Sequence, residues 1–191
     1  MMRIGLVALA VALTFCTHVP PRPDGRVFVG GLQNLYCVDM ACTVYRSEQP
    51  NADDFVAMQQ RLGLKAVVKL NSAIEAHDRL PGGVDLIDDW ILPPGPIAIT
   101  DKLTCVRLHE IVADIDSAPK PVDVHCTLGD DRTGLIAGLW ELWTTSQVIH
   151  PAAPYVWREM IAHGFHDKLY PLLVDAFADC SGYDPRKDGA L

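Results

Sequence analysis

The stretch that most constrains the fold is VDVHCTLGDDRTGLIAG, residues 122–138. Alternating apolar and polar residues predict a short strand that ends at His125, and the apolar pattern after Thr133 predicts a helix. A tight loop joins the two elements. Its backbone N–H groups should converge on one point, with the positive end of the helix dipole behind them. The stretch therefore predicts a binding site for an oxyanion.

Two side chains of this loop can do chemistry. The thiol of Cys126 loses its proton more easily beside such donors, and the thiolate is the nucleophilic form. The guanidinium of Arg132 can bind two oxygens of a phosphate at once. The pattern predicts a phosphate cradle with Cys126 at its base. The competing interpretation is a buried cysteine at a strand end and an unrelated surface arginine.

The rest of the chain alternates strands and helices. Strands are expected at residues 35–38, 42–47, 64–71, 84–92 and 121–125. Helices are expected from Asn51 to Gly63, from Thr100 to Pro119, from Thr133, in a segment ending at Gly164, and through Leu169, Leu172, Leu173, Ala176 and Phe177. This order predicts one α/β domain, a three-layer arrangement with a central, mostly parallel sheet flanked by helices. Ligands are then expected beyond the carboxyl ends of the strands.

The expected domain occupies residues 28–180 of the 191, followed by a tail at 181–191. Residues 1–16 read as a signal peptide, because the apolar run 4–15 is too short to span a bilayer. Residues 17–27 form a proline-containing linker. Export to a bacterial periplasm or the extracellular space is expected, with plain cleavage and lipid attachment at Cys16 both open.

Charge limits the partners. The formal net charge of −8 disfavours nucleic acid and anionic lipid, so a membrane partner is expected only if Cys16 is lipidated. Any anionic substrate must be held by local donors. The domain is expected to act as a monomer.

The chain has six cysteines. Cys37 and Cys42 could close a disulfide across a hairpin, and Cys105 or Cys180 could also pair, but the pairing stays open. Cys105 lies in an apolar helical pattern and is expected to be a small buried residue.

The seven histidines show no paired metal-ligand spacing, so no metal and no cofactor are expected. His150, His163 and His166 are expected at the surface or at helix ends.

At the loop the chain resembles a known family. HCTLGDDRTG is similar to the signature HCxxGxxR(S/T)G of cysteine-dependent protein tyrosine and dual-specificity phosphatases. VYRSEQP, residues 44–50, resembles the RSxQP segment of a compact bacterial and fungal branch. The resemblance implies a dual-specificity-phosphatase-like fold and phosphomonoester hydrolysis through a phosphocysteine.

The resemblance also implies roles. Cys126 is the nucleophile, Thr133 assists departure of phosphate from it, and His125 and Arg46 support the site. The implied phosphate-binding residues are Thr127, Leu128, Gly129, Asp130, Asp131 and Arg132.

The general acid stays open. Many relatives carry it in a Trp-Pro-Asp loop before the cysteine, but here that region reads DDWILPPGPIAITD. Asp131 could be the acid, as in related CxxGxDR loops, or could only orient the loop. The alternative acids are Asp88, Asp89 and Asp101.

The substrate also stays open. Inositol-phosphate and phosphoinositide phosphatases tend to carry lysines at the positions of Thr127, Leu128 and Asp130. Their absence favours a protein or small molecule with one phosphate, hydrolysed by a tyrosine or dual-specificity phosphatase. An inositol-phosphate or phosphoinositide phosphatase is the alternative, with basic charge from Arg46, Lys69 or Arg79. A phosphate-binding module without turnover, a pseudophosphatase, is the non-enzymatic alternative.

Overall fold

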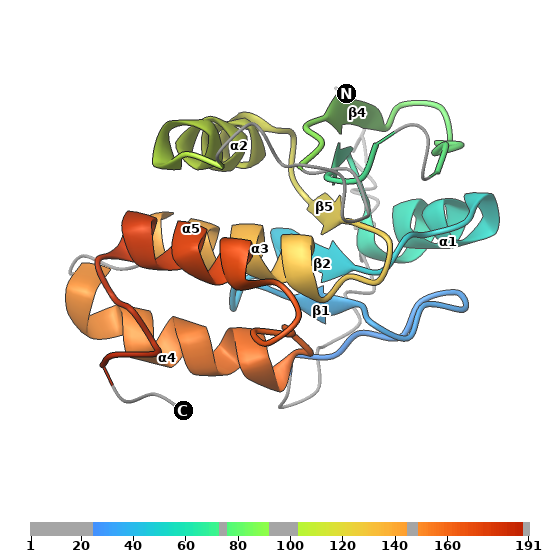
Figure 1. The fold of residues 1–191 in the computed structure, drawn as a ribbon. Helices are drawn as coiled ribbons and strands as arrows, with labels where there is room; N and C mark the ends of the chain where they lie inside the picture. Colours follow the sequence, from blue (N-terminus) through green and yellow to red (C-terminus); the bar gives the residue numbers. More distant parts are fainter. Residues whose placement is uncertain (1–24, 73–75, 92–102, 145–148, 189–191) are drawn as a thin grey trace, which may run out of the picture.

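The structure, a computed structural model, describes residues 25–72, 76–91, 103–144 and 149–188 (Figure 1). The strands of this described part are β1 (Tyr36–Cys37), β2 (Val44–Ser47), β3 (Ala66–Lys69), β4 (Asp85–Asp88) and β5 (Val122–His125). Its helices are α1 (Ala52–Leu62), α2 (Cys105–Ser117), α3 (Asp131–Thr144), α4 (Ile149–Ala162) and α5 (Pro171–Ser181). The signal peptide, Cys16, Thr100 and Asp101 lie outside the described residues.

The strands form one mixed sheet in the order β1-β2-β5-β3-β4. The hairpin of β1 and β2 is antiparallel, and the other pairs are parallel, which confirms the expected fold class. The register pairs Ser47 and Lys69 with His125. The carboxyl ends of three adjacent strands therefore meet where the loop after β5 begins, the place where such sheets bind ligands.

Helix ends follow from capping. The side chain of Asn51 accepts hydrogen bonds from the first turn of α1, and Gly63 ends that helix at φ +73°, as predicted. The start predicted for the next helix is wrong. Helix α2 begins at Cys105, because the hydroxyl of Thr104 accepts the N–H of Arg107 and so caps the helix itself.

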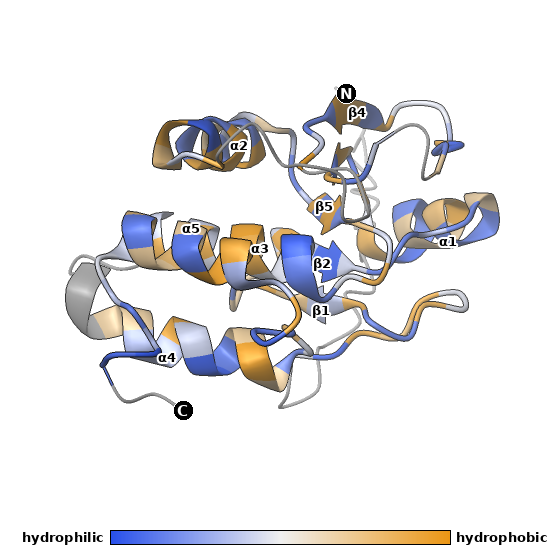
Figure 2. Cartoon of the chain, in the orientation of Figure 1, coloured by the Kyte–Doolittle hydropathy of each residue, from blue (hydrophilic) through white to orange (hydrophobic). Residues whose placement is uncertain are grey.

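The sheet lies between two helical layers. Helix α1 covers one face, and α2, α3, α4 and α5 lie on the other (Figure 1). Helix α3 is buried on nearly every side, which explains why apolar residues run around it rather than along one stripe (Figure 2). The central position of α3 holds its first turn, and the loop before it, in a fixed place.

Two disulfides connect described cysteines. Cys37 pairs with Cys42 inside the hairpin, and Cys105 pairs with Cys180 of α5. The expectation that Cys105 is simply a buried apolar residue is therefore wrong, because the start of α2 lies beside the end of α5.

The packed part of the chain extends slightly past the expected domain limits. Val27 and Tyr183 are both buried. Within the described ranges, no helix is long and apolar enough to cross a membrane.

Candidate active site

Residues 126–132, called the cysteine loop below, join β5 to α3. Gly129 takes φ +81°, and a Cβ atom there would lie 2.6 Å from the carbonyl group of Ser47. Only glycine fits both the conformation and the space. The N–H of Gly134 donates to the carbonyl of Asp130 at 2.9 Å, so the loop runs directly into the first turn of α3. The positive end of a buried helix thus faces the loop.

The two reactive side chains lie within this loop. Cys126 is free of any disulfide and only 3% exposed. Nη2 of Arg132 donates to Oγ1 of Thr127 at 3.2 Å, and its Nη1 donates to the carbonyl of Ile91 at 3.4 Å. The guanidinium therefore folds back along the loop. The buried hydroxyl of Thr133 has no hydrogen-bond partner among the described protein atoms, which leaves it free to serve a ligand.

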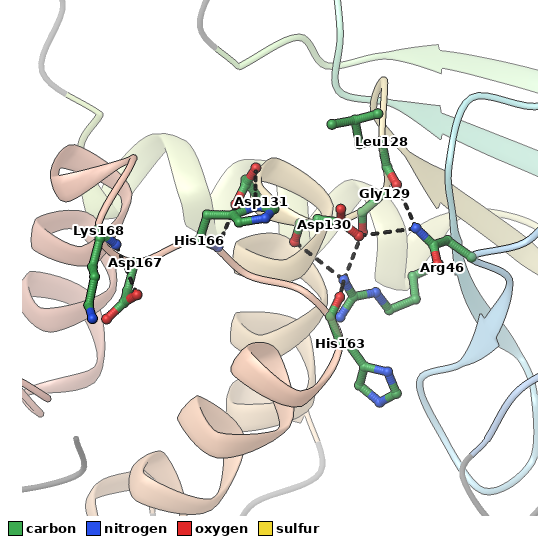
Figure 3. A network of polar contacts seen from close by, with 10 residues as sticks. Arg46, Leu128, Gly129, Asp130, Asp131, His163, His166, Asp167 and Lys168 are labelled. Atoms are coloured by element: carbon green, nitrogen blue, oxygen red, sulfur yellow. Dashed lines mark hydrogen bonds and ion pairs between the residues drawn. The ribbon is translucent and has the colours of Figure 1, made fainter.

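Arg46 supports the loop from beneath. Its Nη2 donates to the carbonyl of Gly129 at 2.7 Å, and it lies 3.3 Å from the carbonyl of Asp130 and 3.5 Å from that of His163 (Figure 3). Burial lowers the pKa of Arg46, while the negative charges of Cys126 and Asp130 oppose this shift. A guanidinium stays charged in proteins, so a buried cation fixes the loop backbone.

A second polar network supports His125, the residue before Cys126. Nε2 of His125 lies 3.0 Å from Oδ2 of Asp78, and both side chains are fully buried. The other oxygen of Asp78 accepts the side-chain amide of Gln49 at 2.7 Å, and Gln49 accepts Nδ2 of Asn71 at 2.8 Å. The backbone N–H of Gln49 also donates to the carbonyl of Thr127 at 3.2 Å.

Two residues of the RSxQP segment thus contact the cysteine loop: Arg46 through the carbonyl of Gly129 and Gln49 through that of Thr127. Burial would raise the pKa of Asp78, but hydrogen bonds from His125 and Gln49 and the charge of Lys69 lower it overall. Asp78 and Asn71 were missed in the sequence, because no local pattern marks them as neighbours of His125.

The two loop aspartates make different contacts. Oδ1 of Asp131 accepts the backbone N–H of His166 at 2.7 Å, and the imidazole of His166 lies 3.2 Å away. His166 was expected to be a surface or helix-end residue, and it also contacts the cysteine loop through Asp131. Oδ1 of Asp130 accepts Nδ2 of Asn34 at 3.2 Å. Burial, opposed by the charge of Arg46 and reinforced by that of Asp131, raises the pKa of Asp130.

The alternative acids lie elsewhere. Asp89 is buried and pairs with Arg107 of α2 at 2.7 Å. Asp88 is exposed at the end of β4. Asp131 directly precedes Arg132 in the loop, whereas Asp101 lies outside the described residues.

Lys69 and Arg79, two basic residues expected to add positive charge to the site, differ in their exposure. Lys69 is buried, and its Nζ donates to the carbonyl of Ala76 at 2.6 Å. Arg79 is exposed.

Leu128 leaves 57% of its surface exposed at the tip of the loop, and its carbonyl accepts Nδ2 of Asn34. Among the described residues, no group of three histidine, cysteine, aspartate or glutamate side chains has an arrangement suited to a metal ion.

Known proteins are similar to this chain in sequence and in fold. No protein-family model matches the chain. The chain is 33% identical over 173 residues to the dual specificity protein phosphatase TpbA of Pseudomonas aeruginosa strain UCBPP-PA14, covering 87% of this chain and 68% of that protein. The crystal structure of P. aeruginosa TpbA has a TM-score of 0.50 at 30% identity, covering 81% of this chain and 85% of that one. The catalytic core of Siw14 is 17% identical with a TM-score of 0.55, over 87% and 98%, and supports the fold alone.

A free cysteine and an arginine in a loop at the start of a buried helix, carried by a mostly parallel sheet, define a cysteine-dependent phosphatase. The similarity in sequence narrows this class. The chain belongs to the dual-specificity protein phosphatase family and is a phosphomonoester hydrolase. The expected fold, family and tyrosine or dual-specificity phosphatase activity are confirmed, while the roles of individual residues stay predictions.

Proposed function

We propose that this phosphatase removes the single phosphate of phosphotyrosine residues in exported proteins, with Cys126 as nucleophile. The observation that carries the proposal is the cysteine loop itself. A free thiol lies directly after β5, at the beginning of the cysteine loop, and the side chain of Arg132 folds back along the same loop toward Thr127. Side chain and backbone donors together suit a tetrahedral phosphate.

In the first step, the Cys126 thiolate attacks phosphorus. The S–P bond forms as the P–O bond to the leaving group breaks, while Arg132 and the loop N–H groups stabilise the equatorial oxygens. A tyrosine oxygen, whose pKa is about 10, leaves only with a proton. In this proposal Asp131, the residue before Arg132 in the loop, gives that proton.

In the second step, water attacks the phosphocysteine. Asp131, now a carboxylate, takes a proton from the water, and the S–P bond breaks to release phosphate. The unpartnered hydroxyl of Thr133 donates to the departing sulfur. Both proton transfers balance, so the enzyme returns to its starting state.

The charges around the loop favour a substrate with one phosphate. Arg46 and Lys69 are buried and bonded to backbone carbonyls, so neither presents a solvent-exposed charge to a second phosphate. Asp130 and Asp131 add negative charge at the rim. A second phosphate on the substrate would be repelled there, which argues against inositol polyphosphates.

Two features support export. The apolar run at residues 4–15 suits a signal peptide, and two disulfides are typical of an oxidising compartment. We propose a periplasmic or extracellular location, with lipid attachment at Cys16 as the variant that would retain the enzyme at a membrane.

One pair of measurements tests the function. Wild type should release phosphate from phosphotyrosine peptides faster than from an inositol polyphosphate. Cys126→Ser should abolish release from both, yet still bind tungstate, because the phosphate cradle remains. Turnover by the purified serine variant would refute the nucleophile, and a preference for the inositol polyphosphate would refute the substrate.

A further inference from the structure

Four successive carbonyl groups of the cysteine loop, those of residues 127–130, each accept a hydrogen bond from another part of the chain. In chain order the donors are the backbone N–H of Gln49, the side-chain amide of Asn34 and, for the last two carbonyls, Nη2 of Arg46 (Figure 3). The donor–acceptor distances are 3.2, 3.1, 2.7 and 3.3 Å. The outer side of the loop backbone is therefore held at four consecutive peptide groups.

These bonds determine where the loop N–H groups point. In a planar trans peptide group, the carbonyl and the N–H of the following residue point in opposite directions. Donors outside the loop that hold the carbonyls of residues 127–130 therefore turn the N–H groups of residues 128–131 toward the inside of the loop. An oxyanion bound there needs this orientation.

Asn34 holds the peptide group at the exposed tip of the loop. Its Nδ2 lies 3.1 Å from the carbonyl oxygen of Leu128 and 3.2 Å from Oδ1 of Asp130. A backbone carbonyl can only accept, so the NH2 end of the amide must face it. The side chain of Leu128 is largely exposed and gives this peptide group little packing support. The bond from Asn34 restrains it instead.

The segment that carries this amide is itself anchored. Leu32 and Leu35 are buried on either side of it. The backbone N–H of Gln33 donates to Oε1 of Glu48 at 2.8 Å. The carbonyl of Gln33 accepts Nε and Nη2 of Arg26 at 3.1 and 2.5 Å. The amide therefore reaches the loop from a backbone whose neighbouring groups are already bonded.

We propose that Asn34 is a positioning residue of the phosphate site. Its amide holds the Leu128 carbonyl outward and so keeps the N–H of Gly129 directed at the bound phosphate, which Asn34 itself does not touch. Asn34 lies outside the HCTLGDDRTG and VYRSEQP stretches, so neither motif indicates it. This inference rests on the proposed role of the cysteine loop as the phosphate site.

Tungstate binding tests the orientation of the loop without turnover. In the Cys126→Ser background, Asn34→Ala should weaken tungstate binding about tenfold at unchanged one-to-one stoichiometry, because one N–H donor no longer faces the anion steadily. Asn34→Asp keeps the shape, but a carboxylate cannot donate and would face the Leu128 carbonyl, so its loss should be larger. Gln60→Ala, which removes an exposed amide from α1, is the matched control and should bind tungstate as the parent does.

Turnover with Cys126 present completes the test. Asn34→Ala should lower kcat/KM about tenfold on phosphotyrosine and on an activated aryl phosphate alike, because both substrates present the same equatorial oxygens to the loop. The urea midpoint should stay close to that of wild type, since Asn34 is only half-buried.

Three results would overturn the positioning role. They are normal tungstate affinity in a folded Asn34→Ala variant, parental affinity in Asn34→Asp, and a loss of turnover confined to phosphotyrosine, which would indicate an effect on proton transfer. If wild type hydrolyses neither substrate, the proposed function fails, whereas the tungstate comparison still judges Asn34.

Discussion

The two faces of the sheet support the cysteine loop in different ways. On the face covered by α3 and α4, Arg46 donates directly to the loop carbonyls of Gly129 and Asp130. On the face covered by α1, the described polar residues bond mostly to one another, and the backbone N–H of Gln49 donates to the loop at Thr127.

This difference separates two tasks. A charged donor under the loop fixes the shape on which phosphate binding depends, because its bonds end on the loop itself. The network around His125 and Asp78 fixes the strand end from which the loop starts, and its bonds mainly hold buried polar groups. Loss of the Arg46 contacts should therefore lower activity, and loss of the network around His125 and Asp78 should mainly lower the stability of the fold.

Among the changes that compare the two faces, Arg46→Met should have the largest effect on turnover. Methionine fills similar space but leaves the carbonyls of Gly129 and Asp130 without their buried donor, at a cost of about 2–3 kcal/mol in the loop arrangement. We expect kcat/KM to fall about 100-fold and tungstate binding to weaken in parallel. Arg61→Met, on the exposed side of α1, is the control and should match wild type. A folded Arg46→Met variant with normal turnover would remove the distinction between the two faces.

Much of this arrangement follows from local sequence. The alternation of strands and helices, the cap at Asn51 and the strand–loop–helix around Cys126 are each encoded within a few residues. Arg46 could also be assigned to the site, because it lies in a short segment that resembles one found beside this loop in relatives.

The parts that were missed depend on contacts between distant segments. Asp78 lies 47 positions before His125, and His166 lies 35 positions after Asp131. Cys105 and Cys180 are 75 positions apart. No periodicity or motif links such residues, because only the folded path of the chain brings them together. The sequence alone therefore predicted Cys126 as the nucleophile and Arg46 as a supporting residue, but not the contacts of Asp78 and His166.

Asp78→Asn should have a smaller effect on turnover and a clear effect on stability. Because the folded pKa of Asp78 is lowered, its ionised form stabilises the native state above its unfolded pKa of about 3.9, and this contribution is lost as the pH falls through the lower folded value. Urea unfolding at pH 7 should show a loss of about 1–3 kcal/mol. The gap should narrow on acidification below about pH 4. A 100-fold loss of turnover with unchanged stability would show that this network acts on the loop as directly as Arg46 does.

Asp123→Asn should change turnover least, although Asp123 is buried on the same face as His125. Its carboxylate accepts the Ser47 hydroxyl at 2.8 Å, and its other oxygen has no hydrogen-bond partner among the described protein atoms. Burial raises the pKa of Asp123 to about 7, against the opposing effects of His125 and Ser47. The Asp123 carboxyl group thus binds its proton more tightly in the folded state than in the unfolded chain.

The sign of the pH effect follows from that shift. The protonated form stabilises the fold fully below the unfolded pKa of about 3.9, and this contribution declines as the pH rises and is lost through about pH 7. Asparagine cannot ionise, so urea unfolding of Asp123→Asn should change less than that of wild type between pH 5 and pH 8. From pH 5 to pH 8 the variant should lose less of its free energy of unfolding than wild type does, and its kcat should equal that of wild type. An identical pH dependence in both proteins would mean that Asp123 is already ionised in the fold and that burial does not hold its proton.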